Sequence, residues 1–339
     1  MPAGACSRGC SATRSRQARN PSIPTGTQSV LLGPEQKTNF RQEDVMSQQK
    51  QTLSYFSQNA ADWQRAASTT NFSVIDNRHN AVLEVMKAYT HAGRLLDVGC
   101  GTGQLAIEAS KKGWHSVGID YAASMIDICK LNNREAGTDA EFHCVSFFDF
   151  AIKPASYDIV SAQGFIEYIS LAELDKFLRR ISKGLKRGGA IALGSRNRLF
   201  NLHSLNEFSL LELKLNTVGK LLHEAIIMQS SKSQPEAIER LAGLNYKYSH
   251  PDMHPETGIK VEKRFQFSPA DLIGRLTKHG LRSTRVFPVH FHGLPLSLTK
   301  DDKLSPLYAE LADLVDKQYI NAHAFVPYSS SFVIEAMKD

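Results

Sequence analysis

The stretch from Arg94 to Asp120, RLLDVGCGTGQLAIEASKKGWHSVGID, constrains the fold of this 339-residue chain more than any other. An apolar run, Leu95–Val98, is long enough for a buried strand, and glycines follow it at alternate positions. Residues Gln104–Lys111 have the composition of a helix, and a glycine follows soon after its end. A second strand, Ser116–Ile119, leads to Asp120. The stretch therefore predicts a strand, glycine loop, helix and strand, the unit that builds a parallel sheet.

This unit suits a ligand that contains a nucleoside. Glycines at the turn from strand to helix let the backbone approach a ligand closely, and the free N–H groups of the helix start favour anionic or polar groups. Asp120 ends the second strand, where a carboxylate can accept both hydrogen bonds from a ribose diol. Two cofactor classes remain open, because Gly101, Gly103 and Ala106 also satisfy the G-x-G-x-x-G/A pattern of nicotinamide dinucleotide sites.

The residues before the glycines favour the other class. Leu95–Gly103 reads LLDVGCGTG, and over nine consecutive residues it resembles motif I of the class I S-adenosylmethionine-dependent methyltransferases. The acid near the end of the first strand, Asp97, is unfavourable beside a pyrophosphate but favourable beside the ammonium group of S-adenosylmethionine. The resemblance is to the small-molecule type, similar to ubiquinone-biosynthesis methyltransferases. It implies S-adenosylmethionine as methyl donor, S-adenosylhomocysteine as product and a small-molecule acceptor.

The resemblance also implies which residues bind the cofactor. Motif I contributes the strand-end acid and the loop: Asp97, Gly99, Cys100, Gly101 and Gly103. The later segment GIDYAASMI is similar to the family's second motif. In that motif Asp120 binds the ribose hydroxyls, while Tyr121 and Met125 flank the adenine.

Recognition of the adenine amino group departs from the family pattern. Ser146 stands where many members have an aspartate, so either Asp149 or the backbone of Phe147 is expected to serve. Gln163 ends the fourth strand, where ligands bind in open α/β sheets, and is the expected neighbour of the sulfonium and methyl group. Glu167, a few residues later, we interpret as a helix-start acid favoured by the helix dipole.

The remaining pattern predicts an α/β, Rossmann-like, seven-stranded and mostly parallel sheet with helices on both faces. Further strands are expected at Glu141–Val145, Tyr157–Ala162, Ala190–Leu193, Leu281–Val289 and Ser331–Met337, the last of them antiparallel as in the family. Residues 46–198 and 264–339 are expected to form the S-adenosylmethionine-binding domain. Residues 199–263 are too long for a simple connection and predict a helical cap, inserted after strand five, that carries acceptor specificity.

The N-terminal part of the chain gives further expectations. Residues 1–45 form a tail whose first 34 residues contain no acidic residue, and we expect disorder or an early start, since Met46 begins a sensible segment. Import into an organelle by this tail stays open. The helix Gln51–Trp63 resembles one that lies over the cofactor in many small-molecule methyltransferases, although ordinary core packing explains its aromatic residues equally well.

Composition excludes several classes of protein. The net charge of +6 is too small and too spread for a nucleic-acid partner, and no apolar run is long enough to span a membrane. Five cysteines form neither a metal spacing nor a disulfide pattern, which indicates a reducing compartment and a cytoplasmic location. The oligomeric state cannot be read from the sequence.

Catalytic residues are less marked than cofactor residues. Methyl transfer needs an aligned acceptor, and a general base is optional. His290 and His292, in PVHFHG just past a strand, are the candidates, although metal ligation or plain packing also fits this pair. Two other functions stay open, a nicotinamide-dependent oxidoreductase and a non-catalytic protein that binds S-adenosylmethionine.

Overall fold

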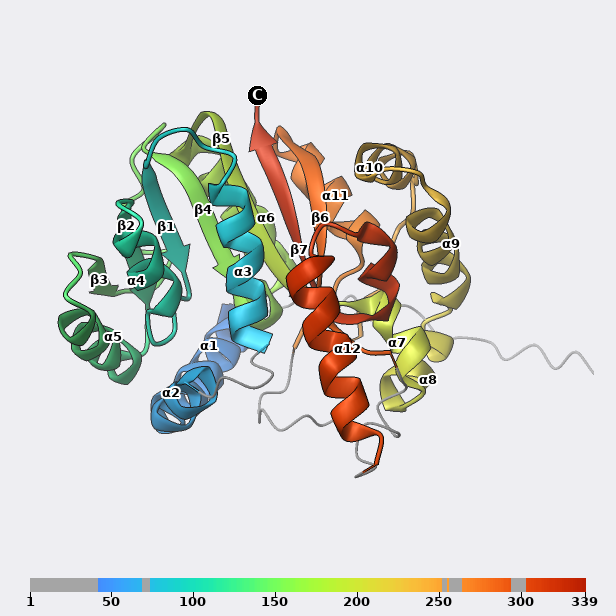
Figure 1. Ribbon diagram of the computed structural model, residues 1–339, viewed down its shortest axis with the longest axis horizontal. Coiled ribbons are helices and arrows are strands. Elements are labelled where there is room, and N and C mark those ends of the chain that lie inside the picture. Colours follow the sequence, from blue (N-terminus) through green and yellow to red (C-terminus); the bar gives the residue numbers. More distant parts are fainter. Residues whose placement is uncertain (1–41, 69–73, 252–254, 256–263, 294–302) are drawn as a thin grey trace, which may run out of the picture. The chain divides into compact units, whose positions relative to one another are not determined.

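The computed structural model describes residues 42–68, 74–251, 255, 264–293 and 303–339, and within them seven strands form one sheet (Figure 1). The strands are β1 (Arg94–Val98), β2 (His115–Asp120), β3 (Glu141–Cys144), β4 (Tyr157–Gln163), β5 (Leu185–Arg196), β6 (Leu281–Phe291) and β7 (Ser329–Lys338). The α-helices are α1 (Gln42–Gln58), α2 (Ala60–Ser68), α3 (Val74–Met86), α4 (Gln104–Lys111), α5 (Ala123–Ala136), α6 (Leu171–Gly184), α7 (Arg198–Ser204), α8 (Glu207–Lys214), α9 (Val218–Ser230), α10 (Gln234–Ala242), α11 (Pro269–Lys278) and α12 (Ser305–Gln318). Two short 3-10 helices are η1 (Phe165–Tyr168) and η2 (His323–Tyr328).

The strand order is β3-β2-β1-β4-β5-β7-β6. Strand β7 runs in the opposite direction to the other six strands and pairs antiparallel with both β5 and β6. In Figure 1 the arrowheads of β1 and β4 point toward α1 and α2, whereas β7 points the opposite way. This topology confirms the predicted seven-stranded, mostly parallel, Rossmann-like sheet and its antiparallel closing strand. The carboxyl ends of β2, β1, β4 and β5 therefore meet along one edge of the sheet.

Central strands are buried on both faces, as their continuous apolar runs predict. Leu95 of β1 belongs to the apolar cluster that contains residues of α3 and α4, while the next residue, Leu96, belongs to the cluster of α6 and α11. Successive strand residues point to opposite faces, so one short run anchors helices on both sides of the sheet. The position of the glycine loop after β1 is fixed by this packing.

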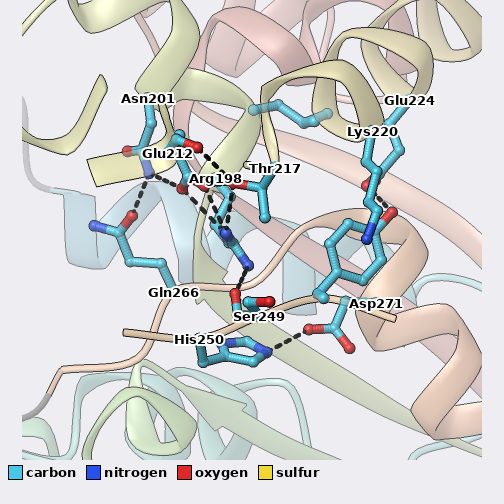
Figure 2. A network of polar contacts seen from close by, with 12 residues as sticks. Arg198, Asn201, Glu212, Thr217, Lys220, Glu224, Ser249, His250, Gln266 and Asp271 are labelled. Atoms are coloured by element: carbon cyan, nitrogen blue, oxygen red, sulfur yellow. Dashed lines mark hydrogen bonds and ion pairs between the residues drawn. The ribbon is translucent and has the colours of Figure 1, made fainter. Parts of the chain in front are cut away.

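The helices between β5 and α11 are joined to the rest of the sheet domain by a buried polar network (Figure 2). Arg198, at the start of α7, forms an ion pair of 2.5 Å with Glu212 of α8, and both side chains are only 2% exposed. Asn201 donates 2.8 Å hydrogen bonds to Glu212 and to Gln266, which lies just before α11. Between β5 and α11 the described residues thus form four separate helices, α7 to α10, and the role of this region as a cap stays a prediction.

The N-terminal part differs from expectation in its boundaries. Most of the predicted tail, residues 1–45, lies outside the described residues, but 42–45 already belong to α1. The single helix predicted over Gln51–Trp63 is two helices, α1 and α2, which meet at Asn59. Among the described residues, no helix is long and apolar enough to cross a membrane.

Candidate functional site

A cavity of about 360 Å³ opens at the carboxyl ends of β1, β2, β4 and β5. The glycine loop after β1 forms one wall, and α1, α2 and α3 supply residues of the others. Of the cofactor residues expected from the sequence, ten line this cavity: Asp97, Gly99, Cys100, Gly101, Asp120, Tyr121, Met125, Ser146, Phe147 and Gln163. Gly103 and Asp149 are not part of its lining. Residues from four separate segments therefore meet at one place, as the parallel sheet requires.

The glycine loop has two kinds of glycine. Gly101 lines the cavity with a φ of +55°, and a side-chain carbon added there would have no atom within 4 Å. Gly103 has a φ of +89° and caps α4, and a side-chain carbon there would lie 3.0 Å from Cys129 and Phe142. Gly101 thus keeps space open for a ligand, whereas Gly103 permits close packing of the loop on its neighbours.

Two carboxyl groups lie in the cavity wall beside this loop. Burial raises the pKa of Asp97 to about 7, and the nearby charge of Asp120 adds to the effect. Burial likewise raises the pKa of Asp120 to about 6, although the backbone N–H groups of Ala122 and Gly101 donate to this carboxylate at 2.9 and 3.2 Å. Both carboxylates would be stabilised by a positively charged or hydroxyl-bearing ligand.

The loop after β3 lines the cavity through Ser146, Phe147 and Phe148. Arg180 of α6 holds this loop from behind, since its guanidinium donates to the carbonyls of Phe147 and Phe148 at 3.0 and 2.6 Å. Asp149 lies outside the cavity lining. Phe147 is thus the alternative for adenine recognition that lies in the cavity lining, and its role stays a prediction. No sequence signal pointed to Arg180.

Gln163 carries an unsatisfied acceptor at the end of β4. Its amide nitrogen donates to Ala192 O at 2.9 Å, while its Oε1 is buried and has no hydrogen-bond partner among the described residues. An unpaired buried oxygen is costly, so a ligand with a donor or a positive charge would be favoured beside it. The predicted position of Gln163 next to the reacting group stays a prediction.

A cluster of arginines surrounds Glu167 of η1, which is fully buried and lines the cavity. Arg78 of α3 donates to Glu167 Oε1 at 2.8 Å, and Arg264 donates to Oε2 at 3.0 Å. Arg196, the last residue of β5, has its Nε 3.8 Å from Oε2. Burial opposes ionisation of Glu167, but the three positive charges outweigh it and hold the pKa of this carboxyl below its usual value. Glu167 lies in the first turn of η1, as expected of a helix-start acid, but the sequence did not predict its contacts with these arginines.

The histidines of the cavity differ from those expected. His79 of α3 lines the cavity, and burial together with the charge of Arg78 lowers its pKa to about 4, so the ring is neutral at pH 7. His290 and His292 are not among the lining residues. They form a cluster beside the cavity, in which His290 Nδ1 lies 2.9 Å from Ser330 Oγ and 3.1 Å from His292 Nε2. The catalytic role of His290 and His292 stays a prediction, and His79 is a cavity residue for which the sequence offered no signal.

The N-terminal helices cover part of the cavity. Gln49, Thr52 and Phe56 of α1 and Trp63 of α2 belong to its lining. The ring of Phe56 packs edge-on against Tyr168 at a centroid distance of 5.3 Å, which joins α1 to η1. None of the described residues between 199 and 251 lines the cavity, so the predicted role of the cap in acceptor binding stays a prediction.

The site can now be compared with known proteins. Residues 95–189 match the model of a methyltransferase domain family. The chain is 31% identical over 156 residues to a ubiquinone biosynthesis O-methyltransferase of Hydrogenovibrio crunogenus, a match that covers 45% of this chain and 62% of that protein. The protein of the same name from Nitrobacter winogradskyi is 33% identical over 105 residues, 31% of this chain and 39% of that protein. The chain thus spans less than two thirds of the length of these relatives.

Among solved structures, the fold is similar to that of magnesium protoporphyrin IX methyltransferase from Synechocystis PCC 6803, with a TM-score of 0.50 and 13% identity. That similarity covers 86% of this chain and 100% of the other. At this identity it concerns the fold alone. The methyltransferase resemblance predicted from the glycine loop is confirmed for residues 95–189, and the comparisons lend no support to the two alternative functions.

Proposed function

We propose that this chain, whose residues 95–189 form a class I S-adenosylmethionine-dependent methyltransferase domain, transfers a methyl group from S-adenosylmethionine to a small-molecule acceptor. One observation carries the proposal. The cavity at the carboxyl edge of the sheet combines an open glycine loop with two buried carboxyl groups, Asp97 and Asp120, whose raised pKa values favour a cationic partner. S-adenosylmethionine carries such charges on its ammonium and sulfonium groups.

The charges of the cavity fit the charges of this cofactor. Asp97 would bind the ammonium group, and Asp120 would accept the ribose hydroxyls in place of the N–H of Gly101. Arg78 would bind the cofactor carboxylate, since its Nε is buried and has no hydrogen-bond partner among the described residues. The unsatisfied Oε1 of Gln163 would face the positive sulfonium region.

S-adenosylmethionine supplies a methyl group on a positively charged sulfur, which leaves with the electron pair of the broken carbon–sulfur bond. The contribution of the protein is to hold the acceptor in line and to remove its proton. His79 is the base we propose for that proton, because it is the histidine that lines the cavity among the described residues. The rings of Phe56 and Trp63 would exclude water.

Oxygen is the acceptor atom that we favour. The sequence alone left oxygen, nitrogen and carbon open. Two relatives of this chain carry the name ubiquinone biosynthesis O-methyltransferase. We therefore propose a hydroxyl group on a small molecule as the methylated group, for which a base such as His79 is useful.

Calorimetric titration of the full chain with S-adenosylmethionine, S-adenosylhomocysteine and NADH tests the cofactor. We expect micromolar binding of the first two and none of the third. Asp120→Ala should weaken S-adenosylhomocysteine binding at least tenfold, because the ribose loses its acceptor. Asp149→Ala is the matched control, since Asp149 lies outside the cavity, and its affinity should stay within twofold of the unmodified chain.

The alternatives give different results in the same experiment. Binding of NADH alone would contradict the proposal and indicate an oxidoreductase. Binding of S-adenosylmethionine without transfer of labelled methyl groups to any member of a library of hydroxylated small molecules would indicate a non-catalytic binding protein.

A further inference from the structure

The edge of the sheet that carries the cavity is polarised in charge. In the strand order β2-β1-β4-β5, Asp120 ends β2 and Asp97 lies near the end of β1. Gln163 ends β4, and Arg196 ends β5. The cavity therefore runs from a carboxylate side, across the neutral end of β4, to an arginine side. A cofactor held by the two carboxylates and by Arg78 leaves Arg196, at the end of β5, for the acceptor.

The arginine side carries more positive than negative charge. Three guanidinium groups, those of Arg78, Arg196 and Arg264, surround the single carboxylate of Glu167. One negative charge neutralises one of them, and the carboxylate of S-adenosylmethionine would neutralise another. Among the described residues, the three guanidinium groups still outnumber the carboxylates that would face them.

Arg196 is the guanidinium with the weakest internal partner. Arg78 and Arg264 each donate a hydrogen bond of 3.0 Å or shorter to Glu167, whereas Arg196 Nε is 3.8 Å away, buried, and without a hydrogen-bond partner among the described residues. The Arg196 side chain is 37% exposed and lines the cavity. Its backbone N–H, by contrast, donates to Glu167 at 3.1 Å. The backbone of Arg196 thus supports the cluster, while its guanidinium is not needed for that purpose.

The surroundings of Arg196 disfavour its protonated guanidinium in the free protein. Burial, and then the positive charges of Arg264 and Arg78, lower the pKa of Arg196 to about 10, so the group stays protonated at neutral pH. His290 lies nearby with a pKa lowered to about 4 by burial and by Arg196 and Arg78, and offers no negative charge. An anion in the cavity would relieve this repulsion.

We infer that the acceptor carries a carboxylate group and that the guanidinium of Arg196 binds it. This inference rests on the proposed methyltransferase function. A guanidinium can form two parallel hydrogen bonds with a carboxylate, which would orient the acceptor as well as hold it. Because Arg196 ends β5, next to the strand that ends in Gln163, a carboxylate bound there leaves the remainder of the acceptor pointing along the cavity toward the end of β4.

Small acids and their amides test the inference with the full chain saturated with S-adenosylhomocysteine. The pairs are benzoate with benzamide, phenylacetate with phenylacetamide, and 4-hydroxybenzoate with its amide. We expect at least one acid to bind at least tenfold more tightly than its amide, measured by ligand-observed NMR and thermal shift. Equal binding of acid and amide in every pair, or no binding of any acid, would overturn it.

Variants then assign the effect to one side chain. Arg196→Gln should abolish the preference for the acid, and Arg196→Lys should keep part of it because the charge is retained. Affinity for S-adenosylhomocysteine should stay within twofold in both, since Glu167 keeps two hydrogen-bonded arginines. Arg179→Gln is the matched control, an exposed arginine of α6 paired with Asp175 outside the cavity. An acid preference that survives in Arg196→Gln would contradict the inference.

The same samples separate this inference from the proposed function. S-adenosylhomocysteine affinity is measured first by calorimetry on the unmodified chain. Its absence would contradict the methyltransferase proposal itself. Binding of S-adenosylhomocysteine without any preference for acids would overturn the carboxylate inference alone.

Discussion

Replacing Asp97 with asparagine gives the most quantitative test of the cofactor site. In the free protein, burial raises the pKa of Asp97 to about 7 and that of Asp120 to about 6. A cationic ligand binds the ionised carboxylates, so binding lowers both pKa values and releases protons. Affinity for S-adenosylhomocysteine, which keeps the ammonium group and the ribose, should therefore rise with pH through this range.

The size of the effect follows from the two pKa values. Asp97 would be about 10% ionised at pH 6 and about 90% at pH 8, while Asp120 would be about 50% and about 99% ionised. The ionised fraction thus rises about tenfold for Asp97 and about twofold for Asp120 between pH 6 and pH 8. The product of these two factors predicts an affinity about 20-fold higher at pH 8 than at pH 6. Asp97→Asn removes the larger factor, and only about a twofold dependence from Asp120 should remain.

Stability of the free protein should change in the opposite direction. The pKa of Asp97 in the folded state lies above its unfolded value, so its contribution to stability is present at low pH and is lost as pH rises through about 7. Asp97→Asn should therefore raise the free energy of unfolding at pH 8, on the order of 1 to 4 kcal/mol, while it weakens ligand binding. A variant that is more stable and binds less is hard to explain by misfolding.

The assay is calorimetry with S-adenosylhomocysteine at pH 6, 7 and 8, in two buffers of different ionisation enthalpy so that proton release is counted. Chemical denaturation of the free protein at pH 5 and 8 gives the stability. Asp149→Asn is the control, because Asp149 lies outside the cavity. An affinity of the unmodified chain that is independent of pH, or a full pH dependence in Asp97→Asn, would refute the reasoning.

Three further predictions concern other parts of the molecule. Gly101→Ala should cost only about 1 kcal/mol of stability, from its positive φ, but at least tenfold in S-adenosylhomocysteine affinity, checked by denaturation and calorimetry. Arg198→Met leaves Glu212 buried without its partner and should lower the free energy of unfolding by about 3 to 5 kcal/mol, with the affinity unchanged; a loss below 1 kcal/mol would disagree. His79→Gln should lower the rate of methyl transfer at least tenfold and more than His290→Gln does, and the reverse order would favour His290 as the base.

Local features of the chain could be predicted well from the sequence. Helix Gln104–Lys111 has the predicted ends, because the glycines before and after it act within a few residues. The cofactor residues of the glycine loop share this advantage. Their positions depend on one strand, one turn and one helix, all contiguous in the chain.

The arginine cluster could not be predicted in this way. Arg78 and Glu167 are 89 positions apart, and Arg264 and Glu167 are 97 apart. Their contact depends on the strand order and on the path of α3 across the sheet, neither of which follows from local composition. Glu167 looked like an ordinary helix-start acid for this reason. His79 was missed because a histidine on a helix gives no sign of which face meets a cavity.

The charged residues on the two sides of the cavity also differ in their position in the chain. Some lie within the region that matches the methyltransferase domain family, and others follow it. Asp97, Asp120 and Gln163 lie within residues 95–189, the region that matches the methyltransferase domain family, and they form the carboxylate side and the middle of the edge. Arg196 and Arg264 follow that region in the chain. Acceptor selection by these arginines could therefore change by substitutions after residue 189 without disturbing the residues that bind the methyl donor. This is the physical reason to expect Arg196→Gln to alter acceptor preference while the affinity for S-adenosylhomocysteine stays the same.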